Sequence, residues 1–511
     1  MQNPNQAFTF DRDTHYVVDL NAALNFPEFF DPTAKLPERH LIISRIYQRS
    51  LHKMREENSD RGTAAGDLAR MLYELITQGR KTQNDGAEEY HLGDKLHVIF
   101  DYQDHAYNGR HIDGEHIKET IALAEYWNTQ STVNHVTVLT NDPIMQISAQ
   151  NRPELDIHMF SPAPYVGRRR IHDEDAINYW RKSKSMTLNT FNSFFPDPEP
   201  FKPNEFVLFG KTNSFSHIGR YDANSDRIVP LKYYRNLHNV TPTSEQQAMA
   251  IEALMAPAEE ISVVILFGAA GSGKTFATTA CALSQTGIAD ARYIDLPQTG
   301  EPTAYASRPN GKRNRKKSTS VEDASAIMLP NKDKKYPYGG ISFLPPDGML
   351  GARMAAVPGD ERAKLAGKTH AIRDNIEAYL RVCGDKKEGG LELTERDLYA
   401  RATTIMNQID LFPLGEINGR SFWDEFIICD EAQFYTLAQI KACIERCDCG
   451  TKLALCGDPS QINNPFSWYG NSLARAVRYL GGDPKVAVVR FEGEENIRRP
   501  GAQIIARSWP H

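Results

Sequence analysis

The residues whose chemistry is easiest to interpret form the run Gly268–Thr275, with the sequence GAAGSGKT. An apolar, β-branched run at Ile261–Phe267 precedes it, and a segment that can form a helix follows it. This is the strand–loop–helix setting in which the pattern G-x-x-x-x-G-K-[ST] binds phosphate. Glycines allow successive backbone N–H groups to point at one anion, and the positive end of the next helix strengthens the attraction. The run therefore predicts a site for a nucleoside triphosphate, ATP, rather than a chance glycine-rich turn.

The side chains around this loop have separate expected roles. Lys274 can reach the β- and γ-phosphates, and the hydroxyl of Thr275 can hold Mg²⁺. Upstream, Gln247 has the better spacing for reading the adenine edge, with Gln246 as the alternative and a plain exposed glutamine as the competing interpretation. The residues expected to contact the nucleotide are Gly268, Ala269, Ala270, Gly271, Ser272, Gly273, Lys274, Thr275, Phe276 and Gln247.

Polar residues after two later strands complete the expected ATP site. FIICDEAQ ends an apolar strand in Asp430, which could hold Mg²⁺ directly or through water, and in Glu431, which could orient or deprotonate the attacking water. After the apolar strand KLALCG, Gln461 could sense the γ-phosphate and relay its presence to a bound strand. Near the end of the sequence, Arg498 or Arg499 could reach the γ-phosphate, in cis or from a neighbouring subunit. Together these residues predict ATP hydrolysis.

A second group of carboxylates lies in the first part of the chain. Asp19 follows the apolar strand in HYVVDLN, Asp142 follows the one in HVTVLTND, and Glu115 opens an amphipathic helix between them. Functional residues of parallel α/β sheets gather at the carboxyl ends of the strands. Clustered carboxylates can hold one or two Mg²⁺ or Mn²⁺ ions that activate water for attack on a phosphodiester. Each acid alone could equally be an ordinary strand-end carboxylate or a helix cap.

Composition narrows the possible classes of protein. A length of 511 residues predicts two to four domains, and 41% hydrophobic and 24% charged residues are ordinary for globular protein. The net charge of −6 argues against a wholly basic nucleic-acid binder. No apolar stretch approaches the roughly 20 residues of a membrane helix, and the first residues lack the apolar core of a signal peptide. The expected location is the cytoplasm, with Cys443, Cys447 and Cys449 as reduced thiols rather than zinc ligands.

The order of strand-like and helix-like segments predicts two α/β domains joined by a small β connector. Residues 1–165 are expected to form a parallel-sheet domain, 166–240 a linker and small antiparallel β connector, and 241–511 the ATPase domain. Within the connector region, Ser161–Pro200 is expected to be irregular, with Arg168–Arg170 as a solvated linker or, alternatively, a phosphate contact. Residues 299–338 are expected to be a basic insert that contacts nucleic-acid phosphates, or a solvated loop, through Arg308, Lys312, Arg313, Arg315, Lys316 and Lys317.

The pattern of acids in the first part resembles that of the PIN-domain ribonucleases. VVDLN matches the first acid of that family at Asp19, VLTND matches the last at Asp142, and GEHI matches the third at Glu115, where the family usually has Asp. At and around the position of the second acid the chain has Arg49, Ser50, Glu56 and Glu57. The resemblance implies a PIN fold and metal-dependent RNA cleavage, and the missing second acid leaves an inactive PIN domain as the alternative.

The second half resembles the PhoH-like ATPases. The order glutamine, GxxxxGKT, DEAQ, GDPSQ and NIRRP is similar to the first motor core of superfamily 1 helicases, and no second core follows. ISFLPPD, IRDNIEAYL and the GRS that leads into DEAQ resemble further PhoH motifs, and KPNEFVLF, GRY and IVPL resemble the connector of PIN–PhoH fusion proteins. One departure is Arg308-Pro309, the candidate for the family's R-P dipeptide, which stands later than expected.

The resemblance implies a function for the whole chain. It implies a RecA-like ATPase that unwinds or translocates along RNA in the 5′→3′ direction, coupled to a PIN-type ribonuclease. A single motor core needs neighbours, so a homo-oligomer is expected, as a hexameric ring with an arginine of one subunit completing the ATP site of the next. The alternatives are an RNA-stimulated ATPase with an inactive PIN domain and a nucleotide-switched adaptor.

Overall fold

The computed structural model describes residues 10–289, 336–346, 370–383, 394–461 and 471–492, with short gaps inside the first and fourth ranges. Ala270, Arg498, Arg499 and residues 290–335, which include the predicted basic cluster, lie outside the described residues. The chain divides into two compact units. One comprises Met1–Tyr165 with the short segments Thr436–Ala438 and Gln461–Arg478, and the other comprises Val166–Tyr435, Gln439–Ser460 and Tyr479–His511.

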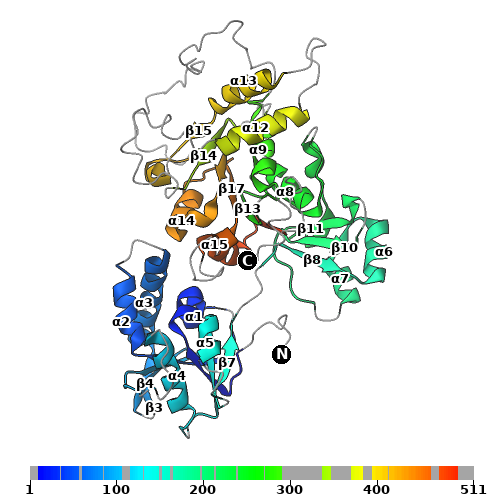
Figure 1. Ribbon diagram of the computed structural model, residues 1–511. Coiled ribbons are helices and arrows are strands. Elements are labelled where there is room, and N and C mark those ends of the chain that lie inside the picture. Colours follow the sequence, from blue (N-terminus) through cyan, green and yellow to red (C-terminus); the bar gives the residue numbers. More distant parts are fainter. Residues whose placement is uncertain are drawn as a thin grey trace, which may run out of the picture. The chain divides into compact units, whose positions relative to one another are not determined.

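The first unit contains a seven-stranded sheet in the order β3-β4-β5-β2-β1-β6-β7. Its strands are β1 (Thr14–Val18), β2 (Arg39–Ser44), β3 (Arg80–Asn84), β4 (Ala87–Leu92), β5 (Leu96–Asp101), β6 (His135–Thr140) and β7 (Asp156–Met159). Its helices are α1 (Leu20–Asn25), η1 (Pro27–Phe30), α2 (Ile46–Met54), α3 (Asp60–Gln78), α4 (Glu115–Trp127) and α5 (Pro143–Ser148), drawn in blue to cyan in Figure 1. The pairs from β5 to β7 are parallel, and β3 and β4 form an antiparallel edge.

The middle strands of this sheet are apolar on both faces, as expected for parallel strands covered on two sides. On one face Val17, Ile42 and Ile99 share a buried cluster with Ile121 and Trp127 of α4. The opposite face packs against helices α1 to α3 through Tyr16, Val18, Leu41, Ile43, Val98, Leu68 and Leu72. The predicted α/β class of this part is confirmed.

The second unit contains two sheets. The smaller has the order β8-β10-β11-β12-β9 and includes β8 (Arg168–Ile171), β9 (Met186–Thr187), β10 (Phe206–Phe209), β11 (Ile218–Asp222) and β12 (Arg227–Pro230). The helices of this part are α6 (Glu174–Ser183), α7 (Leu188–Phe194), η2 (Phe215–His217) and η3 (Tyr234–Asn236). The pairs among β10, β11 and β12 are antiparallel as predicted. The strand β9, which was not expected, adds a further antiparallel pair with β12, and β8 joins β10 in parallel.

The prediction that Ser161–Pro200 is irregular was wrong, because this region contributes β8, α6, β9 and α7. Helix α6 is short, but Asp173 caps its first turn by accepting a hydrogen bond from the Ala176 N–H at 2.8 Å. Trp180 anchors the helix, since its buried ring stacks on Phe209 with centroids 4.5 Å apart. The solvated-linker interpretation of the arginine run was also wrong, because each arginine of the run pairs with a carboxylate: Arg168 with Glu492, Arg169 with Glu205 and Arg170 with Glu245.

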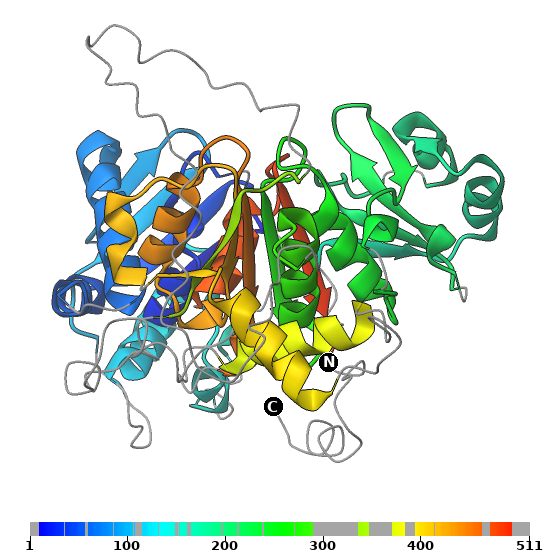
Figure 2. The same cartoon turned by 90° about the horizontal axis from the view of Figure 1, so that it is seen from above.

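The larger sheet of the second unit is parallel throughout, in the order β15-β14-β16-β17-β13-β18. Its strands are β13 (Val263–Gly268), β14 (Gly340–Leu344), β15 (Asp410–Leu411), β16 (Glu425–Cys429), β17 (Lys452–Gly457) and β18 (Val486–Phe491). The helices in this part of the chain are α8 (Glu245–Met255), α9 (Lys274–Thr286), α12 (His370–Cys383), α13 (Glu395–Met406) and α14 (Leu437–Glu445), with the 3₁₀ turns η6 (Leu414–Gly419), η7 (Ala432–Phe434) and η8 (Pro459–Gln461). Helix α15 (Ser472–Leu480) follows in the sequence, and most of it belongs to the first unit. Helices α8, α9, α12 and α13, green and yellow in Figure 2, share one core with Val264 and Leu266 of β13.

A buried carboxylate links helix α8 to the segment that follows the small sheet. Glu252 of α8 accepts backbone hydrogen bonds at the start of η3, from the N–H groups of Lys232 (2.9 Å), Tyr233 (2.7 Å) and Tyr234 (2.9 Å). The three donors converge on one side chain that is almost inaccessible to solvent. The segment that follows the small sheet is thereby fixed to the helix that precedes β13.

Replacing Glu252 with glutamine should lower the free energy of unfolding by about 2 kcal/mol. The amide N–H₂ group of glutamine is a donor, so it would face backbone N–H groups that now donate to a carboxylate oxygen. Chemical denaturation of the full chain measures the change. Glu259→Gln is the matched control, since Glu259 is exposed and should tolerate the same substitution. Equal stability of the two variants would contradict the proposed function of this carboxylate.

Among the described residues, none of the helices is both long enough and apolar enough to cross a membrane.

Candidate functional site

The chain turns from β13 into α9 through the glycine-rich loop. Gly268, Gly271 and Gly273 have positive φ angles of 128°, 78° and 90°, a region that residues with a Cβ rarely adopt. At Gly268 the restriction is also spatial, because a Cβ there would lie 2.0 Å from the carbonyl oxygen of Phe491. Helix α9 begins at Lys274, so its N-terminal N–H groups face the loop. The local geometry matches an anion-binding loop.

Lys274 is folded over this loop. Its Nζ donates to the carbonyl oxygens of Gly268 (2.7 Å) and Ala269 (2.8 Å), and Ser272 Oγ lies 3.3 Å away. Burial lowers the pKa of the lysine, and the negative charge of Asp458 opposes that shift. A phosphate oxygen is a charged acceptor and binds an ammonium group more strongly than a carbonyl does. The lysine is therefore positioned to exchange its backbone partners for a phosphate group.

Thr275 and Asp430 meet although 155 residues separate them in the sequence. Thr275 Oγ1 donates to Asp430 Oδ1 at 3.0 Å, which joins the start of α9 to the residue after β16. Burial raises the pKa of Asp430 to about 6, and the negative charge of Glu431 adds to the shift. A hydroxyl and a carboxylate are the hard oxygen ligands that Mg²⁺ prefers, so these two residues fit a magnesium ion.

Glu431 is held by a residue that the sequence analysis did not single out. Gln433 donates from Nε2 to Glu431 Oε2 at 2.6 Å, and its Oε1 accepts from the N–H of Asp458 at 2.9 Å. Gln433 is buried. Glu431 itself has a positive φ of 54°, an uncommon conformation for a residue with a side chain. The glutamine of DEAQ thus connects the end of β16 to the end of β17, and its place in that motif was the signal available in the sequence.

The remaining predicted nucleotide residues have more ordinary surroundings. Gln247 is buried and its Oε1 accepts from Thr243 N (2.8 Å) and Oγ1 (3.0 Å). Gln246 is buried as well, so the competing interpretation of a plain exposed glutamine was wrong for both residues. Phe276 packs against the hydrophobic core at the start of α9. Gln461 ends η8 directly after β17 and is exposed.

In the first unit, Asp19 and Asp142 follow two neighbouring parallel strands, β1 and β6. Asp19 is fully buried, and its Oδ2 accepts from Thr140 Oγ1 at 3.1 Å. Its other oxygen, Oδ1, has no hydrogen-bond partner among the described residues. Burial raises the pKa of Asp19 to about 6, and Asp142 raises it further while His116 opposes the shift. A buried oxygen without a donor is the kind of group that a metal ion satisfies.

The helix that carries Glu115 brings a different residue to the two aspartates. His116 Nε2 lies 3.8 Å from Asp142 Oδ2 and 3.3 Å from Asn21 Nδ2. Glu115 is exposed and pairs instead with Arg49 at 3.4 Å. Arg49, one of the two residues expected at the position of the second acid of the PIN pattern, thus lies against the predicted third acid. His116 was not predicted as a site residue, because the neighbouring Glu115 was matched to the third acid of the PIN pattern.

One turn further along α4, Glu119 is a carboxylate that the sequence analysis passed over. It lies 3.6 Å from Arg45 Nε, and burial raises its pKa. Its Oε2 is buried without a hydrogen-bond partner among the described residues. The four-residue spacing from Glu115 places both acids on the same face of the helix, and this was the signal that could have identified it.

The sequence of this chain is similar to those of known proteins. Residues 341–509, which contain β14, the Asp430–Glu431 turn and β17, match the family model described as PhoH-like protein. The C-terminal part of this chain is a PhoH family domain. Protein PhoH2 of Bacillus subtilis (strain 168) is 24% identical over 505 residues, covering 94% of this chain and 97% of that protein.

Shorter PhoH matches concern part of the chain only. A PhoH-like protein of the same Bacillus subtilis strain is 31% identical over 150 residues, covering 29% of this chain and 44% of that protein. Protein PhoH2 of Mycolicibacterium smegmatis is 25% identical over 167 residues, covering 32% of this chain and 34% of that protein. The PhoH assignment from the DEAQ and GDPSQ motifs is confirmed, and the PhoH domain has the P-loop NTPase type of fold.

Proposed function

We propose that this chain is an ATP-hydrolysing RNA motor joined to a metal-dependent PIN-type ribonuclease. The observation that carries the ATPase part is the 3.0 Å contact between Thr275 Oγ1 and Asp430 Oδ1. It brings the two expected magnesium ligands together beside the glycine-rich loop, from strands that are not neighbours in the sheet. The PhoH assignment supports the same conclusion. We further propose that residues 1–165, 166–240 and 241–511 are the PIN domain, the connector and the ATPase domain.

The side chains around the loop divide the work of hydrolysis. Lys274 would leave the carbonyls of Gly268 and Ala269 and bind the β- and γ-phosphates. Thr275 and Asp430 would hold Mg²⁺, which neutralises charge on the phosphate oxygens. Glu431 would orient the attacking water and accept its proton, with Gln433 fixing the carboxylate at 2.6 Å. Gln433 also contacts the backbone of Asp458, so the state of the water-orienting group can reach the GDPSQ strand end and Gln461.

The nuclease part rests on the pair of aspartates after β1 and β6. Asp19 and Asp142 would hold Mg²⁺ or Mn²⁺, which supplies an activated water for attack on the RNA phosphodiester. The unpartnered Oδ1 of Asp19 supports a metal ion there. Glu115, predicted as a third ligand, or Glu119 would complete the set. The pairing of Arg49 with Glu115 favours a second candidate, an RNA-stimulated ATPase whose PIN domain binds RNA without cutting it.

The assembly is also a proposal. A single motor core needs a neighbour to complete its site, so we propose a homo-oligomer, a hexameric ring, with Arg498 or Arg499 reaching the γ-phosphate of the next subunit. The basic residues between Arg308 and Lys317 would bind RNA phosphates. A cytoplasmic location fits this function. Sedimentation of the ATP-bound full chain tests the ring, and a monomer with full ATPase activity would exclude it.

Single-stranded RNA should raise the ATP turnover of the full chain severalfold, because the proposed path from Glu431 through Gln433 to Gln461 couples the two ligands. Phosphate release measured with and without RNA tests this, and the stimulation should decline with rising salt as phosphate contacts weaken. Single-stranded DNA of the same sequence is the control for RNA preference. ATP turnover that RNA leaves unchanged would favour a nucleotide-switched adaptor over a motor.

A further inference from the structure

Four histidines form a row across neighbouring strands of the first unit. His15 of β1 pairs in register with His40 of β2, His40 pairs with His97 of β5, and His97 pairs with His91 of β4. Residues paired in this way lie on the same face of a sheet. The rings are in contact, with centroids 4.9 Å apart for His15 and His40, 4.4 Å for His40 and His97, and 4.6 Å for His91 and His97. We call these residues the histidine row.

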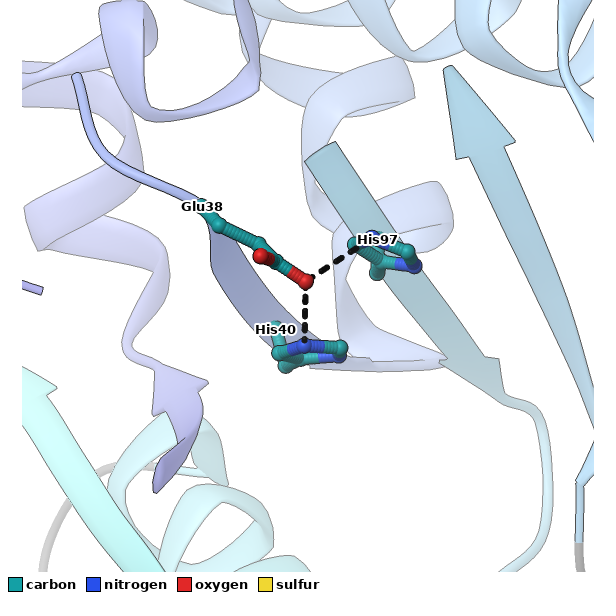
Figure 3. A group of neighbouring side chains, drawn as sticks. All are labelled: Glu38, His40 and His97. Carbon is teal, nitrogen blue, oxygen red and sulfur yellow. Dashed lines mark ion pairs between the residues drawn. The ribbon is translucent and has the colours of Figure 1, made fainter. Parts of the chain in front are cut away.

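A carboxylate points at the middle of the histidine row. Figure 3 shows Glu38, which precedes β2, reaching toward both His40 and His97. Its Oε1 lies 3.7 Å from His40 Nε2 and 3.8 Å from His97 Nε2. One oxygen and two ring nitrogens from different segments therefore converge on one point, and all three side chains are partly accessible, with 16–28% of each exposed.

The hydrogen bonding in this cluster leaves a ring nitrogen of His97 available to a cation. His97 Nδ1 lies 2.5 Å from His91 Nδ1, a hydrogen bond in which one ring donates to the other. When His97 donates, its Nε2 has a free lone pair that faces the Glu38 carboxylate, and this buried Nε2 has no hydrogen-bond partner among the described residues. His97 Nε2, His40 Nε2 and Glu38 Oε1 are thus three ligand atoms within 4.8 Å of one another, while the other oxygen of Glu38, Oε2, lies 3.1 Å from Arg12 Nε.

We propose that Glu38, His40 and His97 bind a divalent transition-metal ion of the Zn²⁺ class. Bonds of about 2.0–2.1 Å in tetrahedral geometry separate ligand atoms by roughly 3.3–3.4 Å. The distances observed from Glu38 Oε1, 3.7 and 3.8 Å, exceed this separation by only a few tenths of an ångström, and the ligand atoms of all three residues lie within 4.8 Å of one another. Two imidazoles and one carboxylate suit zinc and its neighbours rather than magnesium, and partial exposure leaves a fourth position for water.

His91 acts as a positioning residue for this site. Ring nitrogens that bind metal usually have their second nitrogen held by a hydrogen bond, which fixes the tautomer. His91 supplies that contact to His97 and is itself held by Thr82, whose Oγ1 lies 2.9 Å from His91 Nε2. A second carboxylate, Glu89, lies on the far side, 3.8 Å from His91 Nε2. Because Glu89, His91 and His97 also form a possible metal group, the test must separate the two sets.

The proposed site is separate from the carboxylates after β1 and β6. His15 lies near the start of β1 and Asp19 follows its end, and four residues of strand span about 13 Å. The metal would join β2 to β5 in the middle of the sheet. Binding to the folded chain alone would raise the unfolding temperature in proportion to the logarithm of metal concentration.

The experiment uses the full chain stripped of metal and dialysed against Zn²⁺ with excess Mg²⁺, which occupies the oxygen-only sites. Metal analysis should find one tightly held zinc per chain. Glu38→Gln and His40→Gln should weaken binding by more than about 100-fold, because changing even a supporting partner costs 10- to 100-fold. His91→Gln should cost about tenfold. His135→Gln, on an exposed histidine of the same sheet, and Glu89→Gln should leave binding unchanged.

Cobalt in place of zinc identifies the ligands directly. The Co²⁺ protein should show the visible absorption of a low-symmetry nitrogen and oxygen site, without the thiolate charge-transfer absorption that Cys447 or Cys449 would produce. Glu38→Gln is nearly isosteric and its side chain is partly exposed, so it tests the site even where the histidine variants fail to fold. A wild-type chain that holds no zinc, or unchanged zinc affinity in Glu38→Gln, would overturn the proposal, and so would a loss confined to Glu89→Gln.

Discussion

Lys274→Ala is expected to lower the rate of ATP hydrolysis by roughly 1,000-fold or more, since removal of a single preorganised donor to a developing charge already costs 100- to 1,000-fold. The ammonium group is buried over the loop and has only carbonyl oxygens and a hydroxyl as close partners. It is therefore free of a competing ion pair in the described contacts. Alanine would remove both the charge for the phosphates and the contacts that hold Gly268 and Ala269 in place.

Phosphate release by the full chain, with and without RNA, measures this effect. Lys441→Ala is the matched control, because Lys441 is an exposed lysine of α14 that contacts Glu445 in the same helix at 3.6 Å. Binding of a fluorescent ATP analogue should be recorded for both variants, so that lost affinity and lost chemistry are separated. If Lys274→Ala hydrolysed ATP within tenfold of the wild type, the loop would not be the hydrolytic site.

Much of this site could be predicted because its signals are local. The loop, its preceding strand and its following helix occupy one continuous stretch, and glycine at a positive φ has a direct steric reason. The acids of DEAQ likewise follow an apolar strand in the sequence and in the fold. The meeting of Thr275 with Asp430 could be expected only from the rule that parallel strands end at the same edge. The bridging contact of Gln433 could not be predicted, because it depends on how close Gln433 lies to Asp458, which follows β17.

The errors also have physical causes. The apolar residues of Ser161–Pro200 follow no regular pattern. The strand β8 therefore could not be predicted from the sequence, because it is defined by its pairing with β10. On α4, a step of one residue turns a side chain by about 100°, which is enough to bring His116 rather than Glu115 next to Asp142. The histidine row has no local signal at all, since its register across four strands is fixed by the packing of the whole sheet.

The proposed PIN site permits a test in which activity and stability change in opposite directions. Asp19→Asn should reduce metal-dependent RNA cleavage by roughly 1,000-fold, because loss of a metal ligand removes several kcal/mol of transition-state stabilisation. The same change should stabilise the metal-free chain. Burial raises the pKa of Asp19 to about 6, so at neutral pH the folded chain contains a buried charge that asparagine lacks, which costs on the order of 3 kcal/mol.

Cleavage of labelled single-stranded RNA with Mn²⁺, and thermal unfolding in EDTA, measure the two effects. Asparagine can keep the 3.1 Å contact with Thr140, since its amide oxygen accepts the same hydrogen bond. Asp156→Asn is the control, because Asp156 is an exposed aspartate on β7 of the same sheet. Loss of cutting with a higher unfolding temperature would mean that the carboxylate is retained for chemistry at a cost in stability. A wild-type chain that binds RNA but never cuts it would mean that Arg49, by pairing with Glu115, marks a PIN domain that has become an RNA-binding module.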